Sequence, residues 1–353
     1  MNKTILSILK SKKLPIIVCS LLFQQVTSAS DSQNSLKADP DIEYSINCDA
    51  IAIGQYLDQK DGHCNTYLGE LLSITSDIRL TQDFGLNLNL VSDKRCINDK
   101  LTEINAAYLY YIFDMLGEVH LGNDKPIDQY IKSIDEDVCE NRSISSYFNC
   151  PYDSFSKYTI VDDHSALRLM WLSPTFNGFK IGLSYIPNSS ICRGISKRYA
   201  KNLISLGISY EGGQDNVTYG LSSIGYLGKA YESTLRNIKA LACEGVIGYK
   251  NIALSGRTIF DGSSLQRLEQ NNFDTTYMVD LSYTVRNTKL SIGHIVSHRT
   301  SESFETAKAY TASVQHKIGR YNLFTQYKRL YSKNNNGHII TFGISRNFNW
   351  GTL

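Results

Sequence analysis

The strongest constraint on the fold is a two-residue alternation of apolar and polar side chains. In residues 72–80, one face carries Leu72, Ile74, Ile78 and Leu80, and the other carries Ser73, Thr75, Asp77 and Arg79. The same alternation recurs in 178–186 and 274–286. Successive side chains of a strand point to opposite faces, so this pattern indicates strands with one apolar and one polar face. Repeated along the chain, it predicts sixteen strands, from a first strand at 42–56 to a closing strand at 338–348.

Composition and the spacing of the strands narrow the fold class further. A content of 24 Gly, 23 Tyr and 13 Phe against 6 Pro and 4 Met favours an all-β chain. Short connections such as 82–83 and 249–250 alternate with long ones such as 57–67, 123–164 and 187–200. A barrel that crosses an outer membrane has tight turns at one rim, longer loops at the other and an even strand count. We therefore expect an all-β, transmembrane, antiparallel β-barrel.

A large exported β-sandwich is the alternative fold, because its strands would alternate in the same way against a protein core. The polar faces are rich in Ser, Thr, Asn, Asp and Arg, which suits a water-filled interior better than a sandwich surface. After Phe23, no apolar stretch approaches the length that a membrane helix requires.

Residues 1–30 have the pattern of a secretory signal peptide. Lys3, Lys10, Lys12 and Lys13 precede an apolar run over 14–23, and small residues follow at 27–30. We therefore expect a single barrel domain over 31–353 in the bacterial outer membrane, in contact with lipid and inserted by the barrel-assembly machinery. Removing four lysines changes the net charge from +2 to about −2, so nothing in the composition favours binding to nucleic acid.

Seven cysteines follow the signal segment. Cys139 and Cys150 are the closest pair, and an exported chain can oxidise them, so a local disulfide is expected there. Metal ligation is the alternative, but the chain has no C-x-x-C pair and no histidines clustered beside the cysteines. We expect neither a metal nor another cofactor.

Three stretches resemble alphaproteobacterial general-diffusion porins. Residues 107–122 resemble that family's strand, turn and Gly-Glu-Val-x-Leu-Gly box, and 165–185 resemble its Ser-Pro-x-Phe-x-Gly turn between two strands. Residues 337–348 are similar to its closing strand. The resemblance implies a sixteen-stranded barrel, usually a homotrimer, whose longest loop follows strand five and folds inward. Seven cysteines and an end at Leu353, beyond the last aromatic residue, depart from the family pattern.

The long loop after the fifth strand, 123–164, is the candidate constriction. It contains nine acidic and four basic residues, a net charge of −5. A solvated surface loop would explain this charge, whereas inward folding would place the charge in the pore. The acidic candidates are Asp124, Asp128, Asp135, Glu136, Asp137 and Glu140. The polar strand faces supply the basic wall candidates Arg79, Arg168, Lys180, Arg257 and Arg286, of which Arg168 resembles the family's strand-six arginine.

Three functional hypotheses follow. The first is a porin that lets small hydrophilic solutes and ions diffuse, with a bias toward cations from the acidic loop. The second is a surface-exposed adhesin or receptor, favoured by cysteines in the long loops. The third is an enzyme, suggested only by His294 on an apolar strand face, where a bulge or a subunit contact is the simpler explanation. No hydrolase or phosphate-binding motif is present, so we expect no enzymatic activity.

Overall fold

A computed structural model describes residues 43–59, 64–94, 103–131, 166–193, 196–269, 273–298, 306–331 and 336–351. All of them belong to one compact unit, Glu43–Leu353. The strands are β1 Glu43–Gln59, β2 Cys64–Arg79, β3 Phe84–Lys94, β4 Glu103–Phe113, β5 Gly117–Asp124, β6 Ala166–Leu172, β7 Phe179–Arg193, β8 Ser196–Gln214, β9 Val217–Ala230, β10 Ile238–Tyr249, β11 Ile252–Gly262, β12 Asp274–Val285, β13 Thr288–His298, β14 Ala307–Ile318, β15 Tyr321–Tyr331 and β16 Gly337–Gly351. A short 3-10 helix, η1, spans Ile127–Gln129. None of the helical segments in these ranges has the length and apolar character needed to cross a membrane.

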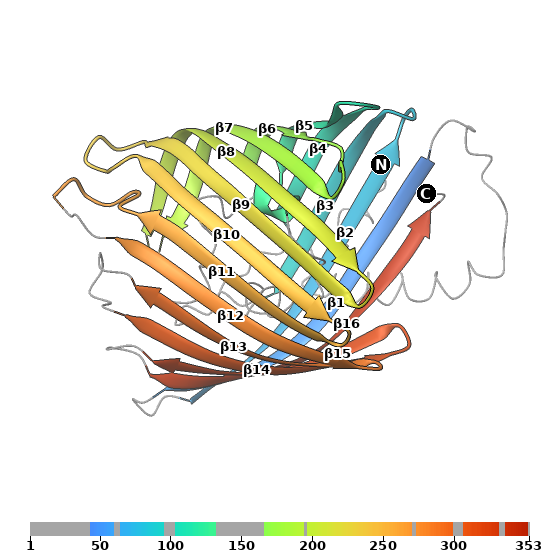
Figure 1. Ribbon diagram of the computed structural model, residues 1–353, viewed down its shortest axis with the longest axis vertical. Helices are drawn as coiled ribbons and strands as arrows, with labels where there is room; N and C mark the ends of the chain where they lie inside the picture. Colours follow the sequence, from blue (N-terminus) through green and yellow to red (C-terminus); the bar gives the residue numbers. More distant parts are fainter. Residues whose placement is uncertain are drawn as a thin grey trace, which may run out of the picture. The chain divides into compact units, whose positions relative to one another are not determined.

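The strands form a closed antiparallel barrel in which each strand pairs with its neighbours in the chain. Closure comes from β1 and β16, which pair from Ser45–Gly351 to Gln59–Gly337. Figure 1 shows these two strands side by side in blue and red. The sixteen-stranded antiparallel barrel predicted from the sequence is therefore confirmed.

The two faces of the strands are those that the alternation predicts. In β7, Ile181 and Leu183 are 39% and 44% exposed on the outside of the barrel, whereas Gly182 and Ser184, which alternate with them, face inward and are buried. A barrel exposes apolar side chains only where lipid covers them, so the outer face matches a hydrocarbon environment. The inner face of β14 is polar, with Thr311, Ser313 and Gln315.

One rim carries tight turns. Residues 215–216, 250–251, 286–287 and 319–320 each connect two strands, and the first residue of each pair has a positive φ. This conformation matches the twist of the flanking strands in a two-residue hairpin. Arg286 lies in one of these turns with a φ of 51°, and not at the end of a strand as predicted from the alternation.

At the opposite rim, the structure differs from two of the predicted loops. Residues 187–200 are mostly strand, because β7 and β8 pair as far as Arg193–Ser196. In the same way β1 continues to Gln59 and β2 begins at Cys64, within the predicted loop 57–67. The strict alternation of short and long connections was therefore wrong at β7–β8. These extensions are rich in polar residues and lack the apolar rows by which the strands were recognised.

Candidate pore constriction

After β5 the chain turns into the barrel. Ile127 and Ile131 are almost fully buried and pack on Gly182 of β7 and Gly207 of β8, which lie directly opposite each other. A Cβ atom at Gly182 would lie 3.0 Å from both isoleucine side chains, and one at Gly207 would lie 3.1 Å from Ile131. The glycine pair therefore forms a recess in the inner wall that holds the segment 125–131, called the inward segment below.

The inner wall beside this recess is apolar. Ile127 and Ile131 of the inward segment belong to one buried cluster that also contains Met170, Leu172, Ile186, Leu203, Ile224, Tyr226, Ile238, Ala240 and Ala242. The sequence predicted a polar lumen, and on this side the prediction was wrong. The inward segment and its neighbours shield these side chains from water, so burial of apolar surface stabilises the segment on the wall.

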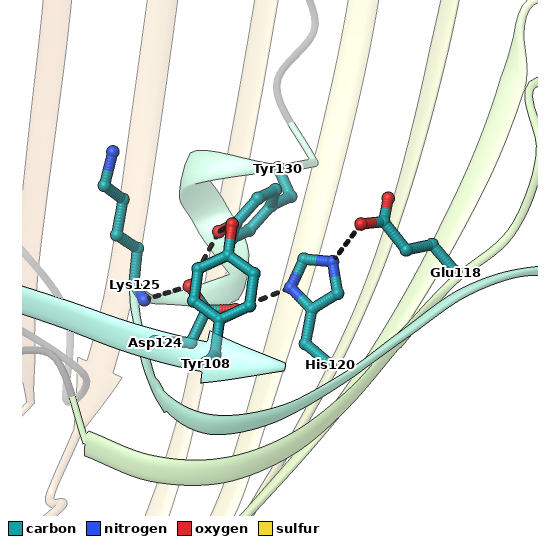
Figure 2. Close-up of polar contacts among 6 residues, drawn as sticks. All are labelled: Tyr108, Glu118, His120, Asp124, Lys125 and Tyr130. Carbon is teal, nitrogen blue, oxygen red and sulfur yellow. Dashed lines mark hydrogen bonds and ion pairs between the residues drawn. The ribbon is translucent and has the colours of Figure 1, made fainter. Parts of the chain in front are cut away.

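A polar network anchors the start of the inward segment. Glu118, His120 and Asp124 lie on the inner face of β5, because alternate residues of a strand share a face. His120 Nδ1 lies 2.6 Å from Asp124 Oδ2, and His120 Nε2 lies 2.7 Å from Glu118 Oε1. Figure 2 shows the imidazole between these two carboxylates. An ionised carboxylate can only accept, so the Nδ1–H group of His120 donates to Asp124, and Glu118 lies beside the other ring nitrogen.

The second oxygen of Asp124 ties the inward segment to β5. Asp124 Oδ1 accepts hydrogen bonds from the backbone nitrogen of Lys125, at 2.6 Å, and from the hydroxyl of Tyr130, at 2.7 Å. The ring of Tyr108 from β4 stacks on His120 at 4.6 Å, and the ring of Tyr130 meets His120 edge-on at 5.4 Å. Tyr108, Glu118, His120, Asp124 and Tyr130 are called the His120 network.

Burial raises the pKa of Tyr130 above its ordinary value of 10, and the neighbouring Asp124 carboxylate raises this pKa further. Tyr130 therefore stays protonated and donates to Asp124. A raised pKa in the folded state contributes stability that is present below pH 10 and is lost as the pH rises through the raised pKa. Between pH 8 and pH 11, we expect the free energy of unfolding to fall by about 1 kcal/mol more in the wild type than in Tyr130→Phe. Urea titrations at the two pH values measure this difference, and equal falls would contradict it.

An ion pair extends from the inward segment to the barrel wall. Asp128 Oδ2 of η1 lies 3.6 Å from Arg257 Nη2 of β11, and both side chains are largely buried. Among the predicted acidic residues, Asp124 and Asp128 thus lie inside the barrel. Asp135, Glu136, Asp137 and Glu140 lie outside the described residues, as do Cys139 and Cys150.

The five predicted basic residues lie at different heights. Arg168 of β6 is buried in the inner wall and pairs in register with Gly122, two residues before Asp124. Arg79 and Lys180 lie on the inner face near the tight-turn rim, at the end of β2 and the start of β7. Arg286 is exposed in its turn. The structure therefore brings Arg257 to the inward segment, keeps Arg168 close to it, and places the other three toward one rim.

Sequence reasoning missed the glycine recess and the His120 network. The spacing of Glu118, His120 and Asp124 on one strand face was a usable signal. The two tyrosines had no such signal, because Tyr108 reaches the site through strand pairing and Tyr130 through the turn of the inward segment. Within the described ranges, no cluster of three or more His, Cys, Asp or Glu side chains could hold a metal ion.

Residues 55–337 match the family model described as Gram-negative porin. The chain belongs to the Gram-negative porin family. It is a bacterial outer-membrane protein that forms a channel for passive diffusion. The match is to Gram-negative porins in general, so the alphaproteobacterial subtype stays a prediction. Nothing in the comparisons supports the adhesin alternative.

Solved structures agree with this fold. The anion-selective porin from Comamonas acidovorans is 14% identical, with a TM-score of 0.63 over 87% of this chain and 100% of that chain. Salmonella typhi OmpF in complex with daunomycin is 12% identical, with a TM-score of 0.62 over 86% and 97%. Pseudomonas aeruginosa OccK2 in complex with glucuronate is 9% identical, with a TM-score of 0.54 over 89% and 99%. No curated protein matches the chain.

Proposed function

We propose that the porin is a cation-biased channel for small hydrophilic solutes, with its constriction set by the acidic segment 123–164. The observation that supports this proposal is the seating of the inward segment on Gly182 and Gly207, because the acidic segment, with its net charge of −5, begins with these residues inside the barrel. An acidic strip in a water-filled pore concentrates cations and repels anions.

We propose that basic residues of the wall and the acidic segment together give the pore a transverse field. Arg168, Arg257 and Lys328 are buried on the inner face of β6, β11 and β15, and Arg257 forms an ion pair with Asp128 of the acidic segment. Such a field orients dipolar solutes. An apolar solute displaces ordered water from the pore and forms no hydrogen bonds in its place, so its entry is unfavourable. We propose that solutes of the size and polarity of monosaccharides and their charged derivatives cross this barrel. The solved complex of OccK2 with glucuronate, a charged monosaccharide derivative, supports this size range.

Neutralising three adjacent acids tests the cation bias. In Asp135→Asn, Glu136→Gln, Asp137→Asn, the reversal potential under a tenfold KCl gradient is expected to shift toward the chloride potential, because three negative charges leave the pore. Planar-bilayer recording measures the shift. The matched control, Asp215→Asn in an exposed tight turn, should leave the potential unchanged. An unchanged reversal potential in the triple variant would indicate that the segment is a surface loop and does not line the pore.

We also propose that the chain is a homotrimer without enzymatic activity. Family membership supports a channel, and the described inner-face groups Asp124, Asp128 and His120 hold the inward segment in place. Three equal conductance steps per insertion event would support the trimer, whereas single steps would contradict it. Hydrolysis of ester substrates by the purified protein would contradict the absence of activity.

A further inference from the structure

The outer face of β13–β16 carries basic and aromatic side chains at the long-loop rim. One row crosses four strands in register, and a second pair lies closer to the rim. The row consists of His294, Tyr310, Arg329 and His338, and the second pair is Lys308 and Tyr331. These six residues are called the rim patch. Their neighbours along each strand, such as Ala309 and Leu330, are buried on the inner face, so the rim patch faces outward.

The aromatic rings of the rim patch hold one another in place. His294 stacks on Tyr310 with ring centroids 4.4 Å apart, and Tyr310 meets Tyr331 edge-on at 5.8 Å. The guanidinium of Arg329 lies over the Tyr331 ring at 4.8 Å. His294 is fixed through Nδ1, which lies 3.2 Å from the carbonyl oxygen of Ala309. The rings therefore form a fixed apolar floor beneath the cationic groups.

The charge of the rim patch is positive. Lys308 and Arg329 are exposed, and the outward positions that pair with Lys308 in register, Val296 and Tyr331, are uncharged. The first acidic position across the sheet is Asp58 of β1, opposite His338. Two permanent cations thus lie on the adjacent strands β14 and β15.

The location of these cations decides which partner fits them. A cation on the lipid-facing surface is unfavourable at the centre of the bilayer and is tolerated only near an interface. The long-loop rim lies at such an interface. The anions present there are the phosphate groups of lipid headgroups, and basic side chains attract them. Below the patch, Ile292 and Val314 are 59% and 45% exposed and offer apolar surface for an acyl chain.

We propose that the rim patch binds the phosphate headgroup of an anionic lipid in the leaflet at the long-loop rim. Arg329 and Lys308 supply the charge, the tyrosine and histidine rings supply the floor, and the apolar side chains below contact the acyl chain. The site explains why His294 lies on an otherwise apolar strand face.

Native mass spectrometry of the full chain tests this site. The wild type is compared with Lys308→Gln, Arg329→Gln in detergent containing either phosphatidic acid or phosphatidylcholine. We expect the double variant to retain phosphatidic acid about tenfold less than the wild type, and phosphatidylcholine to bind both equally. The matched control is Arg346→Gln, because the guanidinium of Arg346 lies over the Tyr321 ring at 4.9 Å on the same strands at the tight-turn rim. It should leave retention unchanged.

Several outcomes would overturn the site. Equal retention of phosphatidic acid by the wild type and the double variant is one, and an equal loss in Arg346→Gln is another. Displacement of the lipid by inorganic phosphate at the same concentration would indicate a site for free anions. A change of oligomeric state without loss of lipid would indicate a contact between copies of the chain. Wild-type conductance of the double variant shows that the barrel has formed, and Lys308→Arg should bind as the wild type does.

Discussion

Asp124→Ala is expected to lower the free energy of unfolding by about 3 kcal/mol and to loosen the inward segment. Asp124 is fully buried and holds three groups at once, namely the His120 imidazole, the Lys125 backbone nitrogen and the Tyr130 hydroxyl. Removing the carboxylate leaves these three donors without this acceptor, and each buried donor without an acceptor costs about 1–3 kcal/mol. It also removes one of the two carboxylates that lie beside the His120 ring.

Urea unfolding of the detergent-folded barrel measures the loss of stability, and single-channel recording measures the loosening as larger current fluctuations in the open state. The matched control is Asp114→Ala, because Asp114 is exposed in the turn between β4 and β5. It should change the free energy of unfolding by less than about 0.5 kcal/mol. If both substitutions cost the same, Asp124 does not anchor the segment.

Gly182→Val with Gly207→Val is expected to reduce the single-channel conductance. The recess has no room for a side chain, since even a Cβ atom would press on Ile127 and Ile131. Valine at both positions therefore pushes the inward segment off the wall and toward the pore axis. Overpacking of this kind costs about 1–3 kcal/mol, so the unfolding midpoint should fall as well.

Gly225→Val is the matched control, because a Cβ atom at Gly225 of β9 would meet nothing within 4 Å. Its conductance should equal that of the wild type. Adding Ile127→Ala and Ile131→Ala to the double valine variant should restore part of the lost conductance, because the smaller side chains free the space that valine takes. Without such a rescue, the loss of conductance would have a cause other than the recess.

The barrel could be predicted from the sequence because strands that cross a membrane must alternate apolar and polar side chains. Lipid selects apolar side chains on the outside, so β2, β7 and β12 could be assigned to both faces correctly from the two-residue period alone. The same rule fails outside the hydrocarbon. The ends of β7 and β8 at Arg193 and Ser196 carry no apolar row, and these strand extensions were therefore taken for a loop.

The constriction was harder to predict because its residues meet through pairing across strands. The Asp128–Arg257 ion pair joins two of the predicted residues, yet nothing in the linear order ranked Arg257 above Arg79 or Arg286. The apolar inner wall at Ile224 and Tyr226 was hidden for another reason. These two residues belong to the same buried cluster as Ile127 and Ile131, so this part of the inner face is apolar and lacks the polar row by which an inner face was recognised.

The pairing of Ser45 with Gly351 has a consequence for how the barrel assembles. Hydrocarbon tolerates no strand with unsatisfied backbone groups, and β1 and β16 each lack one partner until the other is in place. A partly assembled sheet therefore has no stable form in the bilayer. All sixteen strands have to be present before the barrel can close, so closure joins the two ends of the sheet in one cooperative event.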